Sequence, residues 1–228
     1  MAFHVNGDIA LDVVLDAYEY ALRRYNLVGT DHRWRVEHIG GARKDQFERM
    51  KSLGVVPSMG PFQFYYWGDL LDGTMFDTSV GAQWQRFRDA FNAGLPVSFH
   101  NDGSVSPPTP LLNIQTAVTR RTSSGTLRGP EQAVSLQEAL EAETINGAFA
   151  LGIDDKFGSI EVGKVADFVE LSQDPFEVEM RNFASVVAVG GTWLSGSRID
   201  IDEFAAAFGL INNDEFEKLS SLGSGHSC

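Results

Sequence analysis

Three of the five histidines each end a short stretch that is typical of a buried β-strand. These are His4, His38 and His100, and Asp102 comes two residues after His100. In parallel α/β folds the carboxyl ends of the strands share one face, where catalytic residues gather. Imidazoles and a carboxylate on one face can hold a divalent metal such as zinc. Strand-end histidines are also common as hydrogen-bonded structural residues, so this pattern alone leaves both a metal site and a structural role open.

The elements that would position these residues alternate between strand-like and helix-like segments. Strands are predicted over residues 2–5, 34–39, 55–59 and 96–100, and helices over residues 9–25, 43–53, 82–93 and 111–121. Residues 60–79 are expected to form an aromatic loop or an irregular segment. Repeated strand-helix units imply a parallel sheet, because parallel strands need crossover connections. Four units fit either half of a (β/α)₈ barrel or a small open sheet, and periodicity leaves both open.

A different pattern follows the polar linker at residues 122–130. Ser135 and Glu138 predict a capping box, which begins a helix that runs to about residue 150 and ends at Gly152. Strands are predicted over residues 167–172, 186–189 and 192–194, with a hairpin turn at Gly190-Gly191. We therefore divide the chain into a first domain at residues 1–152, a β-rich segment at 153–196 and a polar tail at 197–228.

Composition excludes several classes of function. The net charge of −13 opposes nucleic-acid binding, which depends on clustered Lys and Arg, and it also opposes docking to anionic lipid. The sequence has neither a long apolar run nor the pattern of a signal peptide. A single cysteine, Cys228, cannot form an internal disulfide. We expect a cytoplasmic protein without nucleic-acid or membrane partners.

Several segments resemble, in register, the YtcJ-like branch of the amidohydrolase superfamily. The segment HVNGD from His4 resembles H-x-x-G-D, RVEH ending at His38 resembles R-x-E-H, and HND ending at Asp102 resembles H-S-D. Residues 158–167, GSIEVGKVAD, resemble G-S-I-E-x-G-K-x-A-D. The resemblance extends from about residue 2 to residue 196, and the motifs are specific as a set.

The resemblance implies a fold and a mechanism. The fold would be the C-terminal half of a metal-dependent hydrolase (β/α)₈ barrel, strands five to eight, with part of a small β-sandwich. His4, His38 and Asp102 would bind a divalent metal, with zinc as the expected ion, and Asp102 would also be the catalytic general base. The reaction would be hydrolysis of an amide-type C–N bond in a small molecule, in which the metal polarises the carbonyl and activates water.

The chain also departs from the family pattern. It has neither the H-x-H pair of the first strand nor the bridging ligand that relatives carry before the fifth. Gln63 stands where relatives often have a histidine; it can hydrogen-bond a substrate but cannot act as an acid or base near neutral pH. We predict that Gln63, Tyr66 and His100 bind substrate. The aromatic run at residues 62–67 either lines an apolar pocket or packs against a neighbouring helix.

Two functions stay open at this stage. The chain is either a segment of an amidohydrolase, completed by a missing N-terminal half or by an oligomeric partner, or a catalytically inactive half-barrel that acts as an oligomerisation or interaction module. An N-terminal segment that encodes H-x-H would favour the enzyme. In either case we expect a dimer or larger assembly, because half a barrel exposes unpaired strand edges.

Overall fold

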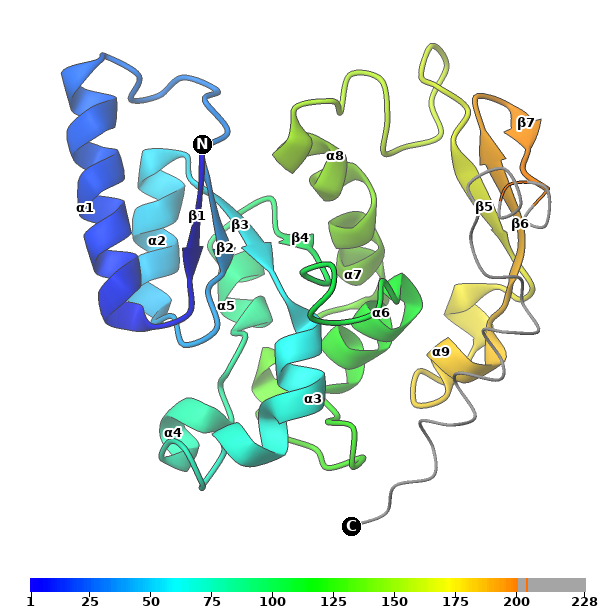
Figure 1. Ribbon diagram of the computed structural model, residues 1–228, viewed down its shortest axis with the longest axis horizontal. Coiled ribbons are helices and arrows are strands. Elements are labelled where there is room, and N and C mark those ends of the chain that lie inside the picture. Colours follow the sequence, from blue (N-terminus) through cyan, green and yellow to red (C-terminus); the bar gives the residue numbers. More distant parts are fainter. Residues whose placement is uncertain (201–203, 205–228) are drawn as a thin grey trace.

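The computed structural model describes residues 1–200 and 204, and its centre is a four-stranded parallel sheet (Figure 1). The strands follow the order β1-β2-β3-β4, with β1 at Ala2–Val5, β2 at Arg35–His38, β3 at Val56–Met59 and β4 at Ser98–Phe99. In the register, His4 is opposite Glu37, and Glu37 is opposite Ser58. The predicted α/β class with a parallel sheet is confirmed, and each of the four predicted strands is present.

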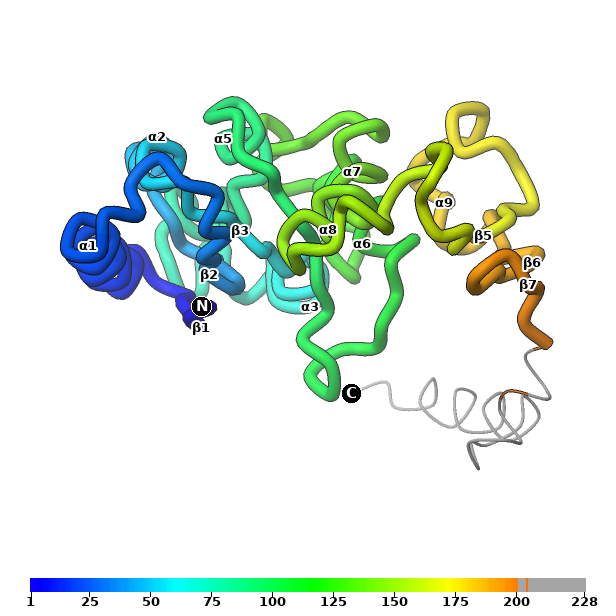
Figure 2. The backbone as a smooth tube through the Cα atoms, turned by 90° about the horizontal axis from the view of Figure 1, so that it is seen from above, coloured from blue at the N-terminus to red at the C-terminus, as the bar shows by residue number. Residues whose placement is uncertain are grey.

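Helices α1 (Asp8–Arg24), α2 (Lys44–Leu53) and α5 (Phe87–Asn92) lie on one side of the sheet (Figure 2). Their apolar faces meet the strands in one buried core, to which Leu15 and Phe47 contribute. Gly54 ends α2 in the left-handed conformation, at φ 72°, as expected for a glycine that follows a helix. This helical layer supports the strands from one side.

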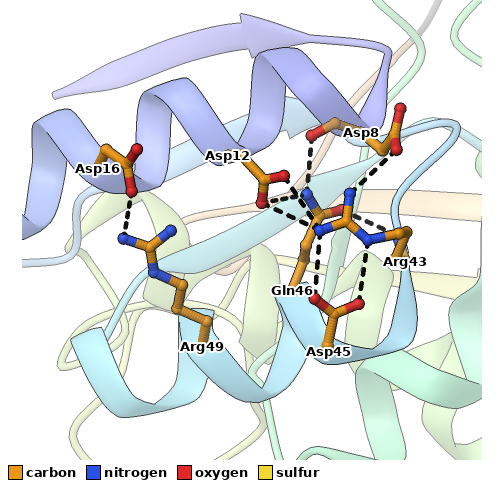
Figure 3. Close-up of polar contacts among 7 residues, drawn as sticks. All are labelled: Asp8, Asp12, Asp16, Arg43, Asp45, Gln46 and Arg49. Atoms are coloured by element: carbon orange, nitrogen blue, oxygen red, sulfur yellow. Dashed lines mark hydrogen bonds and ion pairs between the residues drawn. The ribbon is translucent and has the colours of Figure 1, made fainter.

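A polar seam joins α1 to α2 on the solvent side of that layer (Figure 3). The Arg43 guanidinium lies 3.0 Å from a carboxylate oxygen of Asp8, 3.0 Å from one of Asp12 and 3.2 Å from one of Asp45. Arg49 continues the seam further along the two helices. These side chains are exposed or partly exposed, so that each ion pair is largely screened by water.

The prediction of a loop over residues 60–79 is wrong, because α3 (Pro61–Leu71) and α4 (Thr78–Gly81) lie there. Pro61 occupies the first turn of α3, where its missing N–H leaves no hydrogen bond unmade. The consecutive residues Phe62, Gln63 and Phe64 are all buried. A helix that is buried on several sides has no amphipathic stripe, and periodicity could not reveal it.

The helix predicted over residues 82–93 is much shorter, because only residues 87–92 are α-helical, in α5. Gln85 has φ 59°, which interrupts the helix. The fully buried guanidinium of Arg120 donates to the carbonyl oxygens of Ala82, Trp84 and Gln85 at 3.0, 2.9 and 3.0 Å. It also lies over the Phe64 ring, 3.6 Å from the centroid. A residue distant in sequence therefore satisfies carbonyls that a longer helix would have paired.

Helices α6 (Pro110–Thr119), α7 (Leu136–Glu143) and α8 (Ile145–Leu151) follow β4. Ser135 and Glu138 form the predicted capping box. The single helix predicted to reach about residue 150 is divided at Thr144, whose φ of −123° and ψ of −96° are not helical. Both α7 and α8 contact β4, whereas β1 pairs only with β2 among the described strands. One edge of the sheet is therefore covered and the other is open.

A second, antiparallel sheet contains β5 (Phe168–Leu171), β6 (Val189–Leu194) and β7 (Ser197–Arg198). The predicted hairpin turn at Gly190-Gly191 is wrong, because both glycines lie inside β6 and the chain turns at Ser195-Gly196. A Cβ atom on Gly191 would lie 2.7 Å from the Trp193 ring, so close packing, not a turn, requires glycine there. The rest of the predicted polar tail, residues 201–203 and 205–228, falls outside the described residues.

Three short helices complete the elements of residues 1–200: α9 (Phe183–Val186), η1 (Pro130–Gln132) and η2 (Pro175–Glu177). The start of the predicted strand at 186–189 belongs to α9. In this part of the chain, no helix combines the length and the apolar character needed to cross a bilayer.

Candidate metal and active site

The predicted site residues lie at the carboxyl ends of the parallel strands. His4 belongs to β1, His38 is the last residue of β2, and His100 and Asp102 follow β4. Parallel strands end at one edge of their sheet, which brings these four residues to the same region.

The His38 ring lies between the other two imidazoles. Its centroid is 4.5 Å from that of His4 and 4.8 Å from that of His100, and both contacts are edge-on. The Nε2 atom of His38 is 3.9 Å from a carboxylate oxygen of Asp102. The structure thus brings together all three predicted metal ligands and the predicted substrate residue His100.

Strained backbone directs two of these side chains. Strand alternation would place His38 on the same face as Val36, which is buried in the helix-covered core. A φ of 72° at His38 and 57° at Ile39 breaks that alternation, and the His38 side chain instead lines the cavity that Asp102 also lines. Asp102 itself has φ 51°. Such left-handed conformations are costly for residues other than glycine and are concentrated at functional sites.

Burial favours the neutral forms of His38 and His100. His38 is only 4% exposed, and burial lowers its pKa, with a further contribution from the nearby His4, while Asp102 and Glu37 oppose the shift. Burial likewise lowers the pKa of His100 to about 4. Neutral imidazole is the form that ligates metals and accepts hydrogen bonds.

Two buried nitrogens of these rings lack partners. His38 Nδ1 and His100 Nε2 have no hydrogen-bond partner among the described residues. An unpaired buried polar atom costs about 1–3 kcal/mol, so its persistence points to a group that the protein chain does not itself provide.

The donors fit a divalent ion in type but not in number. Two imidazoles and a carboxylate are common ligands of zinc. In residues 1–200, however, no group of three His, Cys, Asp or Glu side chains converges closely enough to hold an ion. His4 Nε2 also lies 3.3 Å from the side-chain amide of Asn6, which a metal ion at that nitrogen would displace. The described residues thus provide part of a metal site.

A polar layer beneath the histidines was missed as a functional feature by sequence reasoning. Arg35 and Glu37 point to one face of β2, where Arg35 Nε donates to Glu37 at 2.6 Å and Arg35 Nη1 donates to the carbonyl of Ala150 at 3.0 Å. Burial opposes ionisation of Glu37, but hydrogen bonds from Ser58 and Arg35 outweigh it and lower the pKa of Glu37. With His38, His100 and Asp102, these residues line a cavity of about 560 Å³. The alternation of charged residues in a predicted buried strand was the available signal.

An amide network supports the loop that carries Asp102. The side-chain amides of Asn101 and Asn113 bond to each other in both directions, at 2.8 and 3.2 Å. Asn113 also donates to Glu143 at 2.9 Å, which links the loop to α7. The Ser106 hydroxyl donates to the Asn101 carbonyl at 2.8 Å. The strained backbone at Asp102 is therefore held from three separate parts of the chain.

Gln63 is the hub of a second chain of amides. The Trp84 indole N–H donates to Gln63 Oε1 at 3.3 Å, Gln85 donates to the same oxygen at 3.0 Å, and Gln63 Nε2 donates to Asn6 Oδ1 at 3.0 Å. Because an indole nitrogen can only donate, Trp84 fixes which way the Gln63 amide points. The chain continues through Asn6 to His4.

Tyr66 is the predicted site residue that the structure sets apart. It lies on the exposed side of α3, with its ring edge-on to Tyr65 at 5.0 Å, and it is not among the residues that line the cavity beneath His38. Its predicted contact with substrate stays a prediction.

Comparison with known proteins finds relatives over most of this chain. A sequence profile described as "Amidohydrolase family" matches residues 1–199. An N-substituted formamide deformylase of Arthrobacter pascens is 34% identical over 177 residues, which are 78% of this chain and 32% of that protein. A putative amidohydrolase, YtcJ, of Bacillus subtilis is 25% identical over 186 residues, 78% of this chain and 33% of that protein.

A solved structure leads to the same family. The crystal structure of an uncharacterized metal-dependent hydrolase from Pyrococcus horikoshii superposes with a TM-score of 0.64 at 29% identity, covering 78% of this chain and 35% of that one. The chain therefore spans about a third of the length of these relatives. From the profile match over most of its length, the chain belongs to the amidohydrolase family.

Proposed function

We propose that this chain is the C-terminal portion of a metal-dependent amidohydrolase, which hydrolyses an amide-type C–N bond in a small molecule. The observation that carries the proposal is that His38 lies next to both His4 and Asp102 at the strand ends and has a buried, unpaired nitrogen. The relatives support the proposal, because one is named an N-substituted formamide deformylase and the similar solved structure is described as a metal-dependent hydrolase.

The roles of the residues follow from their surroundings. A divalent ion, zinc in this proposal, would be held in part by His4, His38 and Asp102 and would polarise the substrate carbonyl and lower the pKa of water. The Asp102 carboxylate would accept a proton from the attacking water and return it to the leaving nitrogen. His100 is neutral at physiological pH and can form a hydrogen bond with the substrate through its unpaired Nε2.

The strands that complete the barrel would pair with the β1 edge of the described sheet. The β1 edge is open, and beside it Phe3, Ile9, Val13 and Tyr20 are 45–75% exposed. An open strand edge next to exposed apolar side chains is a typical pairing surface. We propose that another copy of this chain, or a polypeptide with the N-terminal half of the barrel, covers it in a cytoplasmic assembly. Analytical ultracentrifugation that finds only monomers of the purified chain would exclude the homo-oligomer.

The metal site is tested by zinc content. Purified protein is dialysed against zinc, desalted and analysed for metal, alongside His38→Asn and, as a matched control, His32→Asn. His32 precedes β2 at its opposite end, where its ring bonds to the Leu53 carbonyl at 2.8 Å. We expect about one zinc per chain in the wild type and in His32→Asn, and none in His38→Asn. Equal zinc in both variants, or none in the wild type, would overturn the proposal.

A further inference from the structure

An apolar cavity of about 320 Å³ opens beside Asn6, which bonds to His4, and differs from the cavity beneath His38. Its apolar walls comprise Trp67, Leu70, Leu71, Met75, Phe76 and Trp84, and its polar end is formed by Asn6 and Gln63. A cavity of this size, mostly apolar and with a few polar groups at one end, is typical of a small-molecule site.

The cavity has a buried floor and an accessible mouth. Leu71 and Trp84 are only 5% and 9% exposed, whereas Leu70 and Met75 at the rim are 50% and 56% exposed. The rings of Phe76 and Trp84 are stacked, with centroids 5.3 Å apart and planes inclined by 19°. One wall is therefore flat and aromatic, which favours a planar ring as its occupant.

The aromatic wall is held rigidly against the strand ends. Arg120 donates to the Trp84 carbonyl at 2.9 Å. A Cβ atom on Gly40, two residues after His38, would lie 2.4 Å from the Trp84 indole, so the tryptophan fits only because that residue is glycine. A preformed wall lowers the entropy lost when a ligand binds.

The polar end of the cavity leads directly to the candidate metal site. Gln63 and Asn6 bond to each other, and Asn6 bonds to His4. A ligand with its apolar part in the cavity would therefore have its polar part beside His4. We infer that the cavity binds the aromatic group of the substrate, and that the preferred substrates are small amides that carry an aryl group. The hydrolysis of the bound amide rests on the proposed function, but binding of the aryl group in the cavity does not.

Binding is measured with N-(4-fluorophenyl)acetamide, followed by ¹⁹F NMR in metal-free protein, with N-cyclohexylacetamide as the non-planar competitor. The variants are Trp67→Ala, which removes part of the wall, and Leu70→Trp, which fills the cavity from its exposed rim. Trp193→Ala is the matched control, because Trp193 stacks on Phe168 in the second sheet. Circular dichroism of each variant establishes that it is folded.

We expect the aryl amide to bind more tightly than the cyclohexyl amide and both cavity variants to weaken its binding, Trp67→Ala by roughly 2- to 10-fold. Trp193→Ala should bind like the wild type. Equal weakening in Trp193→Ala, or no preference for the planar ring, would overturn the inference. So would an affinity that falls as protein concentration rises, because a second copy would then occupy the cavity.

The two proposals fail separately. Aryl-amide binding by protein that takes up no zinc at His38 would leave the cavity assignment intact and remove the proposed function. Zinc bound at His38 without aryl-amide binding would do the reverse.

Discussion

Arg43 and Arg120 each bind several oxygen-bearing groups, but in opposite surroundings. Arg43 lies on the α1–α2 seam with its carboxylate partners Asp8, Asp12 and Asp45, all open to water (Figure 3). Arg120 is fully buried and donates to three backbone carbonyls of residues 82–85. Neighbouring carboxylates raise the pKa of Arg43, whereas burial lowers that of Arg120 to about 9, which still leaves it charged at neutral pH.

The comparison shows which polar contacts of this fold position the candidate site. On the seam, water can replace each partner, and the helices are held mainly by the apolar core beneath. Around the candidate site, buried donors hold backbone that has no helix or strand to pair with, and strained residues persist beside them. Polar groups near the strand ends therefore position the site. Those on the seam contribute little to the stability of the helical layer that supports it.

The largest effect is expected for Arg120→Met. It removes the donor of four backbone carbonyls. We expect it to lower the free energy of unfolding by roughly 3–5 kcal/mol, because each buried carbonyl left unpaired costs about 1–3 kcal/mol. Urea denaturation measures this. Because the same change releases Trp84, the aryl-amide affinity should fall in any fraction that stays folded. A decrease in the free energy of unfolding no larger than that caused by Arg43→Met would contradict the contrast between the two regions.

An intermediate effect is expected at Glu143, which supports the Asp102 loop through Asn113. Burial raises the pKa of its carboxyl from 4.5 to about 7, against the hydrogen bond from Asn113. The folded state thus holds the proton more tightly than the unfolded chain. The stabilising contribution is complete below about pH 4.5 and is lost as the pH rises through about 7.

Glu143→Gln should remove this dependence on pH, because glutamine can still accept the bond from Asn113 without ionising. We expect its unfolding free energy to rise relative to the wild type by roughly 2–3 kcal/mol between about pH 5 and about pH 8. Glu141→Gln, on the same helix, is the control and should follow the wild-type profile. Parallel pH profiles for Glu143→Gln and the wild type would show that the buried carboxyl does not differ from those on the seam.

The smallest effect is expected for Arg43→Met, the matched partner of Arg120→Met. Its three ion pairs are exposed, so the urea midpoint should shift little at low salt and not at all at about 1 M NaCl, where the Debye length is about 3 Å. A large loss of stability that persists in high salt would mean that the seam, too, is a structural anchor.

Much of the framework followed from local pattern. The four strands, α1, α2 and the capping box at Ser135 were predictable because amphipathic periodicity, terminal glycines and caps are properties of short segments. The proximity of the motif residues His4, His38 and Asp102 could be predicted because parallel strands end at one edge of the sheet. The family, too, was recognisable from those motifs.

Elements that depend on distant partners were not predictable in this way. Helix α3 is buried on several sides and has no stripe to detect. Residues 82–85 leave the helical conformation because Arg120, more than thirty positions away, binds their carbonyls. Gly190 and Gly191 looked like a turn, but both lie inside β6, where the Trp193 ring packs closely against Gly191.

The sequence by itself determined the donor types of the candidate site and the order of the elements that carry them, because both follow from residue identity and short-range spacing. Only the tertiary structure decided that His38 Nδ1 and His100 Nε2 are unpaired, that a polar layer of Arg35 and Glu37 lies beneath them, and that an aromatic cavity opens beside Asn6. These features arise from burial and contact between segments far apart in the chain, which change the energy of each group and which no local pattern records.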